Sequence, residues 1–304
     1  MLFARRAEAR ATLDALAAYA PSDIVMHLNP PVFETAFLRW PAALPRSATI
    51  IGYWAWELNR LPALWAKRAP ICDEIWAPSP FVAEAVRASA PDFEGAVRVY
   101  PHPVARDPFP RTTPEGRTAA RAKLGVPNDA YVAGLSFSMS SNFARKNPLA
   151  AVAAFTQAFP DAPDARLLVR LLDPDDFPRG HAELQAHAAR DPRIRILGRA
   201  DAGIAEFYQA LDVLISLHRS EGYGLNIAEA TQAGLDVVAT AWSISPELLA
   251  TPNVRAIGST LVNVDDPQGV YGAIEGAQWA DANIADAAAV SAVANAAMLR
   301  CGAS

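Results

Sequence analysis

HRSEGYGLNIAEATQAGLDVVATAWS, residues 218–243, is the stretch of this sequence that decides the fold. It follows the β-rich run VLISLH (213–218), continues as a helical stretch and, after Gly234, enters a second β-rich run, DVVATA (236–241). Strand, helix and strand in this order indicate a unit with two parallel strands. Ligands of open parallel sheets bind where strands end and loops lead into helices, so we expect chemistry in the loop after residue 218.

The same alternation of strands and helices extends over almost the whole chain. The other β-rich runs are 23–29, 48–58, 74–79, 97–102, 131–138, 165–172, 193–198 and 259–264. The helical stretches between them are 32–40, 61–69, 80–89, 147–159, 203–210 and 225–233. This pattern predicts the α/β class, with Rossmann-like, doubly wound parallel sheets.

One segment interrupts the alternation. Residues 101–116, PHPVARDPFPRTTPEG, contain five prolines and no apolar periodicity, which is typical of a linker. We therefore expect an N-terminal domain over 1–108 and a C-terminal domain over 109–284. The alanine-rich end, 285–304, is predicted as a helix that can pack back on the N-terminal domain.

Composition excludes several classes of protein. Apolar residues make up 52% of the 304 residues, which is too many for a disordered chain. Two cysteines, Cys72 and Cys301, cannot form a disulfide framework, and no Cys/His spacing suggests a zinc site. No apolar run is long enough for a membrane helix, and the N-terminus lacks the apolar segment of a secretory signal. The sequence predicts a cytoplasmic protein.

The charge balance bears on partners. A net charge of −5 argues against general nucleic-acid binding, which needs a basic surface. Arg5, Arg6 and Arg10 form a small basic cluster, which we interpret as a solvated helix face or as a weak contact with an anionic membrane surface. The oligomeric state leaves no trace in the sequence.

Two glutamates stand in the deciding stretch, Glu221 in the loop and Glu229 eight residues later on the helix. Gly222 and Gly224 let the backbone turn sharply and approach a ligand. The free N–H groups of the following helix start suit a phosphate or a sugar hydroxyl. A carboxylate has two acceptor oxygens, so either glutamate could hold a vicinal diol such as a ribose.

A second loop supports the first. The strand YVAGLSFS (131–138) continues into MSSNFARK, after which Asn147 and Pro148 are a suitable N-cap and first residue for a helix. Arg145 and Lys146 therefore precede the positive end of a helix dipole, where cations are disfavoured. Either an anion such as a diphosphate binds between them, or they are a solvated basic pair.

Both loops resemble a known family. EGYGLNIAEATQAGLDVVAT is similar to the signature EGFG-xxx-EAMA-xGxPVVAT of retaining glycosyltransferases of family four, which have the GT-B fold (glycosyl transferases group 1). SSNFARKNPLAAVAAFTQAF resembles the RKNP segment of a bacterial subgroup, and GYWAWELNRLPALW, DEIWAPSPFVAEAV and VRVYPHPV resemble that subgroup's first domain. The resemblance extends from about residue 21 to 285.

The resemblance implies a nucleotide-diphosphate sugar as donor and a hydroxyl acceptor, with no cofactor and no metal. Arg145 and Lys146 would contact the diphosphate, and Glu229 would hold the ribose. Glu221 would act as a catalytic residue at the donor sugar, beside Gly222, Tyr223 and Gly224.

The sequence departs from the family in two places. An additional Arg that the family often carries after the first strand of this domain is replaced here by Ser138-Met139-Ser140. The family's first strand and Gly-rich loop have no counterpart in residues 1–20, so we expect a shortened N-terminal domain. The acidic runs 173–176 and 265–266 would be turn residues or, as a weaker alternative, metal ligands.

The acceptor would bind to the N-terminal domain. Trp54 and Trp56 are predicted on one face of a strand, either in the core or stacking on a sugar. Glu57 at the end of this strand is the acceptor-contact candidate, with a surface carboxylate as the alternative.

Three histidines are further candidates. His27 lies near the end of the first β-rich run (23–29), near the position where the family often has a histidine that contacts sugar and acceptor, so it is either catalytic or a buried structural residue. His102 and His218 could each line a cleft between the domains.

The sequence therefore predicts a glycosyltransferase, of hexosyltransferase type, acting on a glycan, lipid or exopolysaccharide precursor. Two alternatives stay open, a nucleotide-sugar-binding protein without turnover of its own and a GT-B epimerase of the nucleotide sugar.

Overall fold

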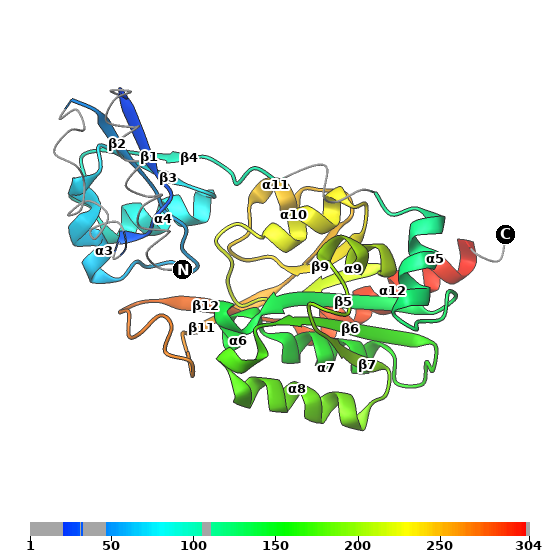
Figure 1. The fold of residues 1–304 in the computed structure, drawn as a ribbon. Helices are drawn as coiled ribbons and strands as arrows, with labels where there is room; N and C mark the ends of the chain where they lie inside the picture. Colours follow the sequence, from blue (N-terminus) through cyan, green and yellow to red (C-terminus); the bar gives the residue numbers. More distant parts are fainter. Residues whose placement is uncertain (1–20, 31, 33–46, 105–110, 302–304) are drawn as a thin grey trace, which may run out of the picture. The chain divides into compact units, whose positions relative to one another are not determined.

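The computed structural model describes residues 21–30, 32, 47–104 and 111–301, with side chains up to residue 292. The chain divides into two compact units, Met1–Pro101 and His102–Ser304 (Figure 1). The predicted boundary at 108, the arginine cluster 5–10 and nearly all of the predicted helix 32–40 lie outside the described residues.

The N-terminal unit contains a parallel sheet in which the described strands follow one another in chain order, β1-β2-β3-β4. Its elements are β1 (Asp23–Met26), β2 (Thr49–Tyr53), α3 (Ala63–Arg68), the short 3₁₀ helix η1 (Ala69–Ile71), β3 (Glu74–Ala77), α4 (Pro80–Ser89) and β4 (Ala96–Val99). Helix α4 begins where its sequence predicts, because Ser79 caps the N–H of Val82 at 3.3 Å and Pro80 occupies the first turn.

The two tryptophans of the N-terminal unit belong to its core. Strand β2 ends at Tyr53, so the predicted strand 48–58 is too long. Trp54 and Trp56 nevertheless are 0% and 7% exposed, and both contact the ring of Trp65. This burial confirms their core role. Buried aromatic surface of this size contributes strongly to the stability of a small sheet.

The C-terminal unit is built around a six-stranded parallel sheet of order β10-β9-β8-β5-β6-β7. The chain enters at the centre, moves out through β6 and β7, returns to β8 beside β5, and moves out on the other side. This is the strand order of a Rossmann fold, and its direction reverses between β5 and β8. The α/β class with parallel sheets is confirmed. Its strands are β5 (Tyr131–Ser138), β6 (Ala165–Leu172), β7 (Ile194–Leu197), β8 (Val213–Ser216), β9 (Asp236–Thr240) and β10 (Val254–Ile257).

Helices cover both faces of this sheet (Figure 1). One core joins α7, α8 and α12 to one face, and a second joins α5, α9 and α10 to the other. Helix α7 faces the first core with Val152 and Phe155, which are fully buried. The helices are α5 (Pro114–Lys123), α6 (Phe143–Lys146), α7 (Pro148–Ala158), α8 (Pro178–Arg190), α9 (Ile204–Ala210), α10 (Leu225–Gln232), α11 (Pro246–Leu249) and α12 (Ile284–Cys301), with the 3₁₀ helices η2 (Met139–Ser141) and η3 (Pro174–Asp176).

Some elements differ from the prediction. Pro114, assigned to the linker, opens α5, because Thr113 caps the N–H of Gly116 at 3.1 Å. The run 259–264 is not a strand of the parallel sheet. It forms β11 (Ser259–Asn263), which pairs antiparallel with β12 (Gln278–Ala282).

The C-terminal helix α12 packs first within its own unit. Ala287 lies in the core beneath α7, and Ser291 is also buried. Packing of the helix end on the N-terminal domain stays a prediction, since side chains after residue 292 lie outside the described part.

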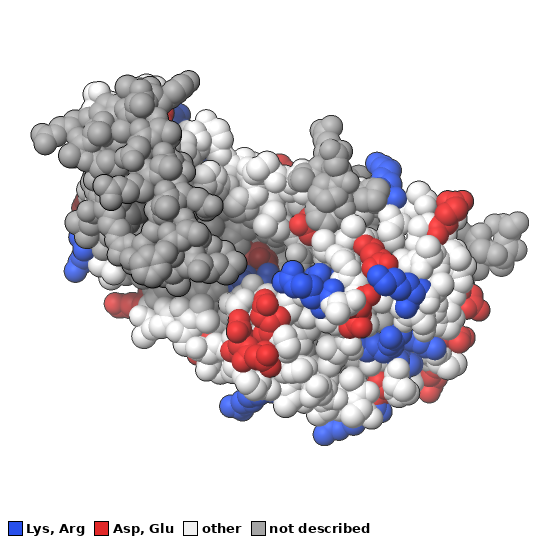
Figure 2. Space-filling view, in the orientation of Figure 1, with Lys and Arg blue, Asp and Glu red and all other residues white. Residues whose placement is uncertain are grey.

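The surface of the C-terminal unit carries both signs of charge. In Figure 2, basic and acidic side chains are interspersed over the visible face. Among the described helices, none combines the length and the apolar character that crossing a membrane requires.

Candidate functional site

The candidate site lies at the carboxyl ends of β5 and β8, where the strand order reverses. The loop 139–147 leaves β5 and the loop 217–224 leaves β8, and both strands are neighbours in the sheet. A reversal of this kind opens a crevice between two loops that turn toward opposite faces. A small pocket there is lined by Ser136, Lys146, Glu221, Gly224 and Asn226.

The loop after β5 is held by two asparagines in left-handed or neighbouring conformations. Asn142, at φ 75°, accepts the N–H of Arg145 at 3.0 Å and caps the one-turn helix α6. Asn147, at φ 50°, stands at the N-cap position of α7 but does not cap it. Its amide instead donates to the carbonyl of Leu217 at 3.0 Å, which ties this loop to the end of β8.

The loop after β8 turns at Gly224, whose φ of 97° strongly favours glycine. Gly224 is the N-cap residue of α10 and has no side chain with which to cap this helix. The N–H of Glu221 donates to Oγ of Ser243 at 2.6 Å, and Ser243 itself has a φ of 67°. A positive φ is strained for a serine, so the surrounding structure must hold the loop after β9 in this conformation. In it, the hydroxyl of Ser243 supports Glu221.

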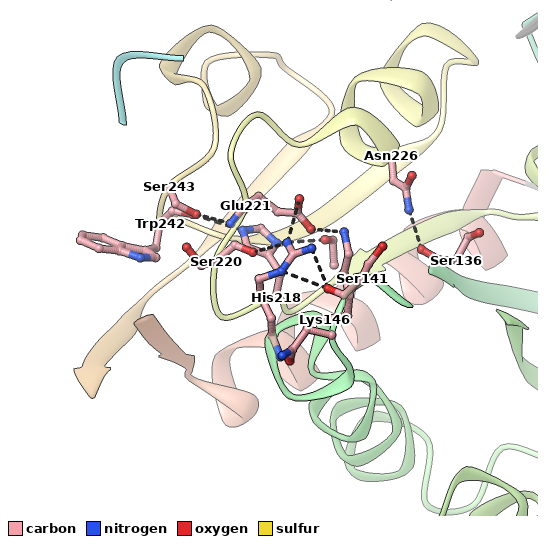
Figure 3. A network of polar contacts seen from close by, with 12 residues as sticks. Ser136, Ser141, Lys146, His218, Ser220, Glu221, Asn226, Trp242 and Ser243 are labelled. Carbon is pink, nitrogen blue, oxygen red and sulfur yellow. Dashed lines mark hydrogen bonds and ion pairs between the residues drawn. The ribbon is translucent and has the colours of Figure 1, made fainter. Parts of the chain in front are cut away.

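Glu221 and Lys146 point toward each other across the two loops and form an ion pair (Figure 3). Nη1 of Arg145 lies 3.3 Å from the other oxygen of Glu221. Burial opposes ionisation of Glu221, yet the two cations outweigh it and lower its pKa to about 2. Glu221 therefore stays a carboxylate at neutral pH, an acceptor of hydrogen bonds that has no proton to give.

Arg145 acts as a brace between the loops. It is 3% exposed, and its Nη2 donates to the carbonyl of Ser141 at 2.8 Å while Nη1 donates to that of Ser220 at 2.9 Å. Since its guanidinium is used by the protein, we expect it to affect a ligand through its charge, whereas Lys146, at 18% side-chain exposure, can reach one.

His218 is buried in this site and has a defined tautomer. Its Nε2 lies 3.1 Å from the carbonyl of Trp242, which can only accept, so Nε2 carries the proton. Nδ1 then accepts the hydroxyl of Ser216 at 3.0 Å. Burial lowers the pKa of His218, so the ring is neutral and joins the ends of β8 and β9.

Glu229 lies on α10 and is half-buried. Its Oε2 accepts the phenol of Tyr208 at 2.9 Å. Burial raises the pKa of this carboxyl, and the hydrogen bond from Tyr208 partly offsets the effect. Asn226, one turn earlier on the same helix, donates its amide to the carbonyl of Ser136 at the end of β5 (Figure 3).

The remaining candidates lie elsewhere. His27 is exposed and stacks on Tyr53 with ring centroids 4.5 Å apart, so the prediction of a buried structural histidine is wrong. Glu57 is half-buried in the same unit. In the C-terminal unit, the ring of His102 meets the ring of Tyr223 edge-on at 5.4 Å. His27 and Glu57 therefore belong to one unit, and the donor-site candidates with His102 to the other.

The acidic runs have turn roles. Asp173, at φ 52°, accepts the hydroxyl of Ser138 at 2.5 Å. Asp266 accepts the N–H of Gln268 at 3.0 Å and that of Tyr271 at 2.9 Å. In the part of the chain that the structure describes, no three carboxylate, histidine or cysteine side chains are grouped as a metal site would require.

Three supporting residues, Tyr208, Ser243 and Asn226, are absent from the sequence prediction. Ser243 and Tyr208 contact glutamates 22 and 21 positions away, and this distance leaves no local pattern. Asn226 stands inside the deciding stretch, where a polar residue in the first turn of a helix was the available signal.

Replacing Glu221 with glutamine is expected to change how stability depends on pH. The pKa of Glu221 is about 2 in the folded protein against an ordinary 4.5. The ion pair therefore contributes fully above 4.5, and its contribution is lost as the pH falls toward 2. Denaturant unfolding at several pH values should show wild type more stable than Glu221→Gln at neutral pH, with the difference shrinking in acid. Glu206→Gln is the control, because Glu206 pairs with Lys123 and its carboxylate is more exposed than that of Glu221. A difference in stability that does not depend on pH would contradict the low pKa of Glu221.

With this geometry established, the chain can be compared with known proteins. The switch-point site on a doubly wound sheet places it in the class of Rossmann-like ligand-binding folds. The sequence model of the glycosyl transferases group 1 family matches residues 139–277, which include both site loops. Most of the C-terminal unit therefore matches the group 1 glycosyltransferase family.

Solved structures confirm the fold. The chain is similar to a glycosyltransferase from Rickettsia africae, with 19% identity over 82% of this chain and 66% of that one and a TM-score of 0.63. It is similar to HepE from Anabaena in complex with UDP and glucose, at 18% identity, 82% and 67% coverage and TM-score 0.60. WaaG, a glycosyltransferase of lipopolysaccharide biosynthesis, matches at 16% identity, 87% and 72% coverage and TM-score 0.54.

The fold is thus GT-B, and the predicted resemblance to glycosyl transferases group 1 is confirmed, while retention of configuration and the bacterial subgroup stay predictions. The chain spans 66% of the length of the Rickettsia protein. None of the curated proteins shows a significant sequence match to it.

Proposed function

We propose that this chain transfers a sugar from a nucleotide-diphosphate sugar to a hydroxyl acceptor. The observation that carries the proposal is the Lys146–Glu221 ion pair at the switch point of the sheet, directly before the uncapped start of α10. Together they offer a positive group for a diphosphate, backbone N–H groups for an anion or hydroxyl, and a permanent carboxylate for sugar hydroxyls.

Lys146 would stabilise the leaving group. As the bond from the sugar to the diphosphate breaks, negative charge grows on the diphosphate oxygens, and a fixed cation lowers the energy of that state. Glu221 keeps the ammonium charged and in place, and Arg145 adds positive charge from behind without leaving its carbonyl partners. These groups could supply the charge that a divalent metal supplies in other transferases, so we propose a metal-independent reaction.

The two glutamates would divide the donor between them. Glu221 would accept hydroxyls of the transferred sugar, and its low pKa suits an acceptor rather than a proton donor. Glu229 would accept the vicinal hydroxyls of the ribose, eight residues further along the chain. Tyr223 and the backbone of Gly222 and Gly224 lie between these positions.

The comparisons support a nucleotide sugar as donor. HepE is similar to this chain and has been solved with UDP, with UDP and glucose, and with UDP-glucose. WaaG acts in lipopolysaccharide biosynthesis. We also propose that the acceptor is a glycan, lipid or exopolysaccharide precursor and that His27, Glu57 or His102 contacts it. The transfer would retain the configuration of the sugar, and the protein would act in the cytoplasm.

A thermal-shift panel tests the donor site. UDP, GDP and ADP, and their glucose conjugates, are each added to the full chain. One of them is expected to raise Tm by several degrees, because a ligand at 100 times its Kd stabilises the folded state by about 2.7 kcal/mol. Divalent cations should leave the shift unchanged, and no shift with any nucleotide would contradict the proposal.

Product analysis then separates the alternatives. Acceptor-dependent release of nucleotide supports transfer. Conversion of the nucleotide sugar without an acceptor, seen by NMR, would instead show an epimerase. Binding without turnover across glycan and lipid acceptors would show a nucleotide-sugar-binding protein.

A further inference from the structure

A buried polar cluster lies on the α9/α10 face of the large sheet. It contains Tyr208 on α9, Glu229 on α10 and Arg170 near the end of β6. Tyr208 is 1% exposed and Arg170 is 6% exposed. Buried polar groups at this depth are expected to have specific partners, so their arrangement carries information.

Tyr208 makes a directed contact with Glu229. Its phenol donates to Oε2 at 2.9 Å, and the carbonyl of Asn226 in the first turn of α10 is a second, longer acceptor at 3.4 Å. The ring of Tyr208 is packed in the core that joins α9 and α10 to the sheet. The donor atom is therefore fixed by packing, and it holds one oxygen of a carboxylate that would otherwise rotate.

The other oxygen of Glu229, Oε1, keeps its hydrogen-bonding capacity. Among the described residues, no side chain or backbone N–H donates a hydrogen bond to Oε1 of Glu229. Oε2 keeps a second lone pair beside the one that Tyr208 uses. A carboxylate held in this way can accept two adjacent hydroxyls, whereas a freely rotating one must first lose rotamer entropy.

Arg170 supplies the charge of the cluster. Its Nε donates to the carbonyl of Ala202 at 3.0 Å and its Nη1 to the hydroxyl of Ser136 at 3.3 Å. Its charge favours the ionised form of Glu229 against the effect of burial. Tyr208 from α9 and Arg170 from β6 are the groups that face this carboxylate and act on its titration.

We propose that Tyr208 is a positioning residue for the donor: its phenol fixes the carboxylate of Glu229 so that the free oxygen meets the vicinal diol of a ribose. This inference rests on the proposed function, since it needs a ribonucleotide in the pocket. It adds a residue that touches no ligand and acts through Glu229.

The test compares Tyr208→Phe with wild type on ligands with and without the diol. Calorimetry is run with UDP, GDP and ADP, each beside its 2′,3′-dideoxy analogue. Tyr208→Phe keeps the ring and its packing, and it is expected to weaken binding of the ribonucleotide about tenfold while leaving the dideoxy analogue unchanged. Tyr131→Phe is the matched control, because this buried phenol has no hydrogen-bond partner among the residues that the structure describes and lies at the opposite end of β5.

A pH profile separates positioning from simple packing. Loss of the phenol removes a hydrogen bond that favours the ionised carboxylate, so the pKa of Glu229 rises further. As the pH is lowered, ribonucleotide binding by Tyr208→Phe should therefore begin to weaken at a higher pH than binding by wild type. Equal losses for both ligand types, or an unshifted profile, would overturn the proposal.

Glu229→Gln distinguishes this failure from failure of the proposed function. Suppose that Glu229→Gln removes the preference for ligands with the diol and Tyr208→Phe does not reduce this preference. Glu229 then holds the ribose, but Tyr208 does not position Glu229. If no ribonucleotide binds wild type, or if Glu229→Gln changes nothing, the donor site itself is wrong.

Discussion

Replacing Arg121 with methionine is expected to lower the free energy of unfolding of the C-terminal unit by about 3–5 kcal/mol, the usual cost of breaking a buried ion pair. Arg121 is 0% exposed, and its Nη2 lies 2.8 Å from Oδ2 of Asp212. Its other N–H groups donate to the carbonyls of Ala210, Asn128 and Ala130. Methionine would leave those carbonyls without this donor and would remove the buried cation from the carboxylate of Asp212.

The position of this pair explains why the effect should be on stability alone. Asp212 accepts the N–H of Val132 at 2.7 Å, so the pair joins the amino ends of β5 and β8. Ligands of such sheets bind at the carboxyl ends. Arg121→Met should therefore reduce Tm by roughly 10 °C and leave nucleotide affinity unchanged wherever the protein is still folded.

Arg117→Met provides the matched control. Arg117 pairs with the same carboxylate, yet its side chain is 31% exposed, and partly solvated pairs are worth about 1 kcal/mol or less. Chemical denaturation of both variants gives the comparison. Equal losses of stability for Arg117→Met and Arg121→Met would show that burial does not set the strength of this network.

The strands of the second unit were predictable because their chemistry is local. β5 and β6 have the predicted bounds, Tyr131–Ser138 and Ala165–Leu172, since both are apolar runs bounded by turn residues. β11 was assigned to the wrong sheet because its partner, β12, follows a long irregular connection. Pairing across such a distance depends on tertiary contacts that a β-rich run of five residues does not encode.

Some features of the site could likewise be predicted from local sequence, and others depend on tertiary contacts. Glu221, Lys146 and Glu229 could be named from the sequence, because functional loops follow strands and the glycine pattern marks a close backbone approach. The use of Arg145 by backbone carbonyls could not be predicted, since both acceptors depend on how two loops meet. Nor could the neutral state of His218, which follows from its burial between two strand ends.

Two cations compensate the charge of the Glu221 carboxylate, and they differ in exposure. An ionised carboxylate inside a pocket is costly unless cations accompany it, and Glu221 has one buried and one partly exposed cation. The buried cation is fixed by carbonyls, so the exposed one is the group that can change partners. An incoming diphosphate would therefore compete with Glu221 for Lys146 and leave Arg145 in place.

Replacing Lys146 with methionine is accordingly expected to weaken nucleoside-diphosphate binding about 10- to 100-fold, because a charge-assisted hydrogen bond to phosphate is lost. Turnover should fall further, by about 100-fold or more, since charge on the leaving group is greatest in the transition state. Calorimetry and acceptor-dependent nucleotide release measure the two effects. Lys123→Met, which breaks a pair of Lys123 with Glu206 on the surface, should change neither.

A role for Lys146 in folding alone would give a different result. Lys146→Met also leaves Glu221 paired with Arg145 but without the lysine, so some loss of Tm is expected in the absence of ligand. Lys146→Arg keeps the positive charge and should recover part of the nucleotide affinity, which a purely structural role does not require. Reduced Tm with unchanged affinity and turnover in Lys146→Met would remove this lysine from the donor site, and with it the observation on which the proposed transfer reaction rests.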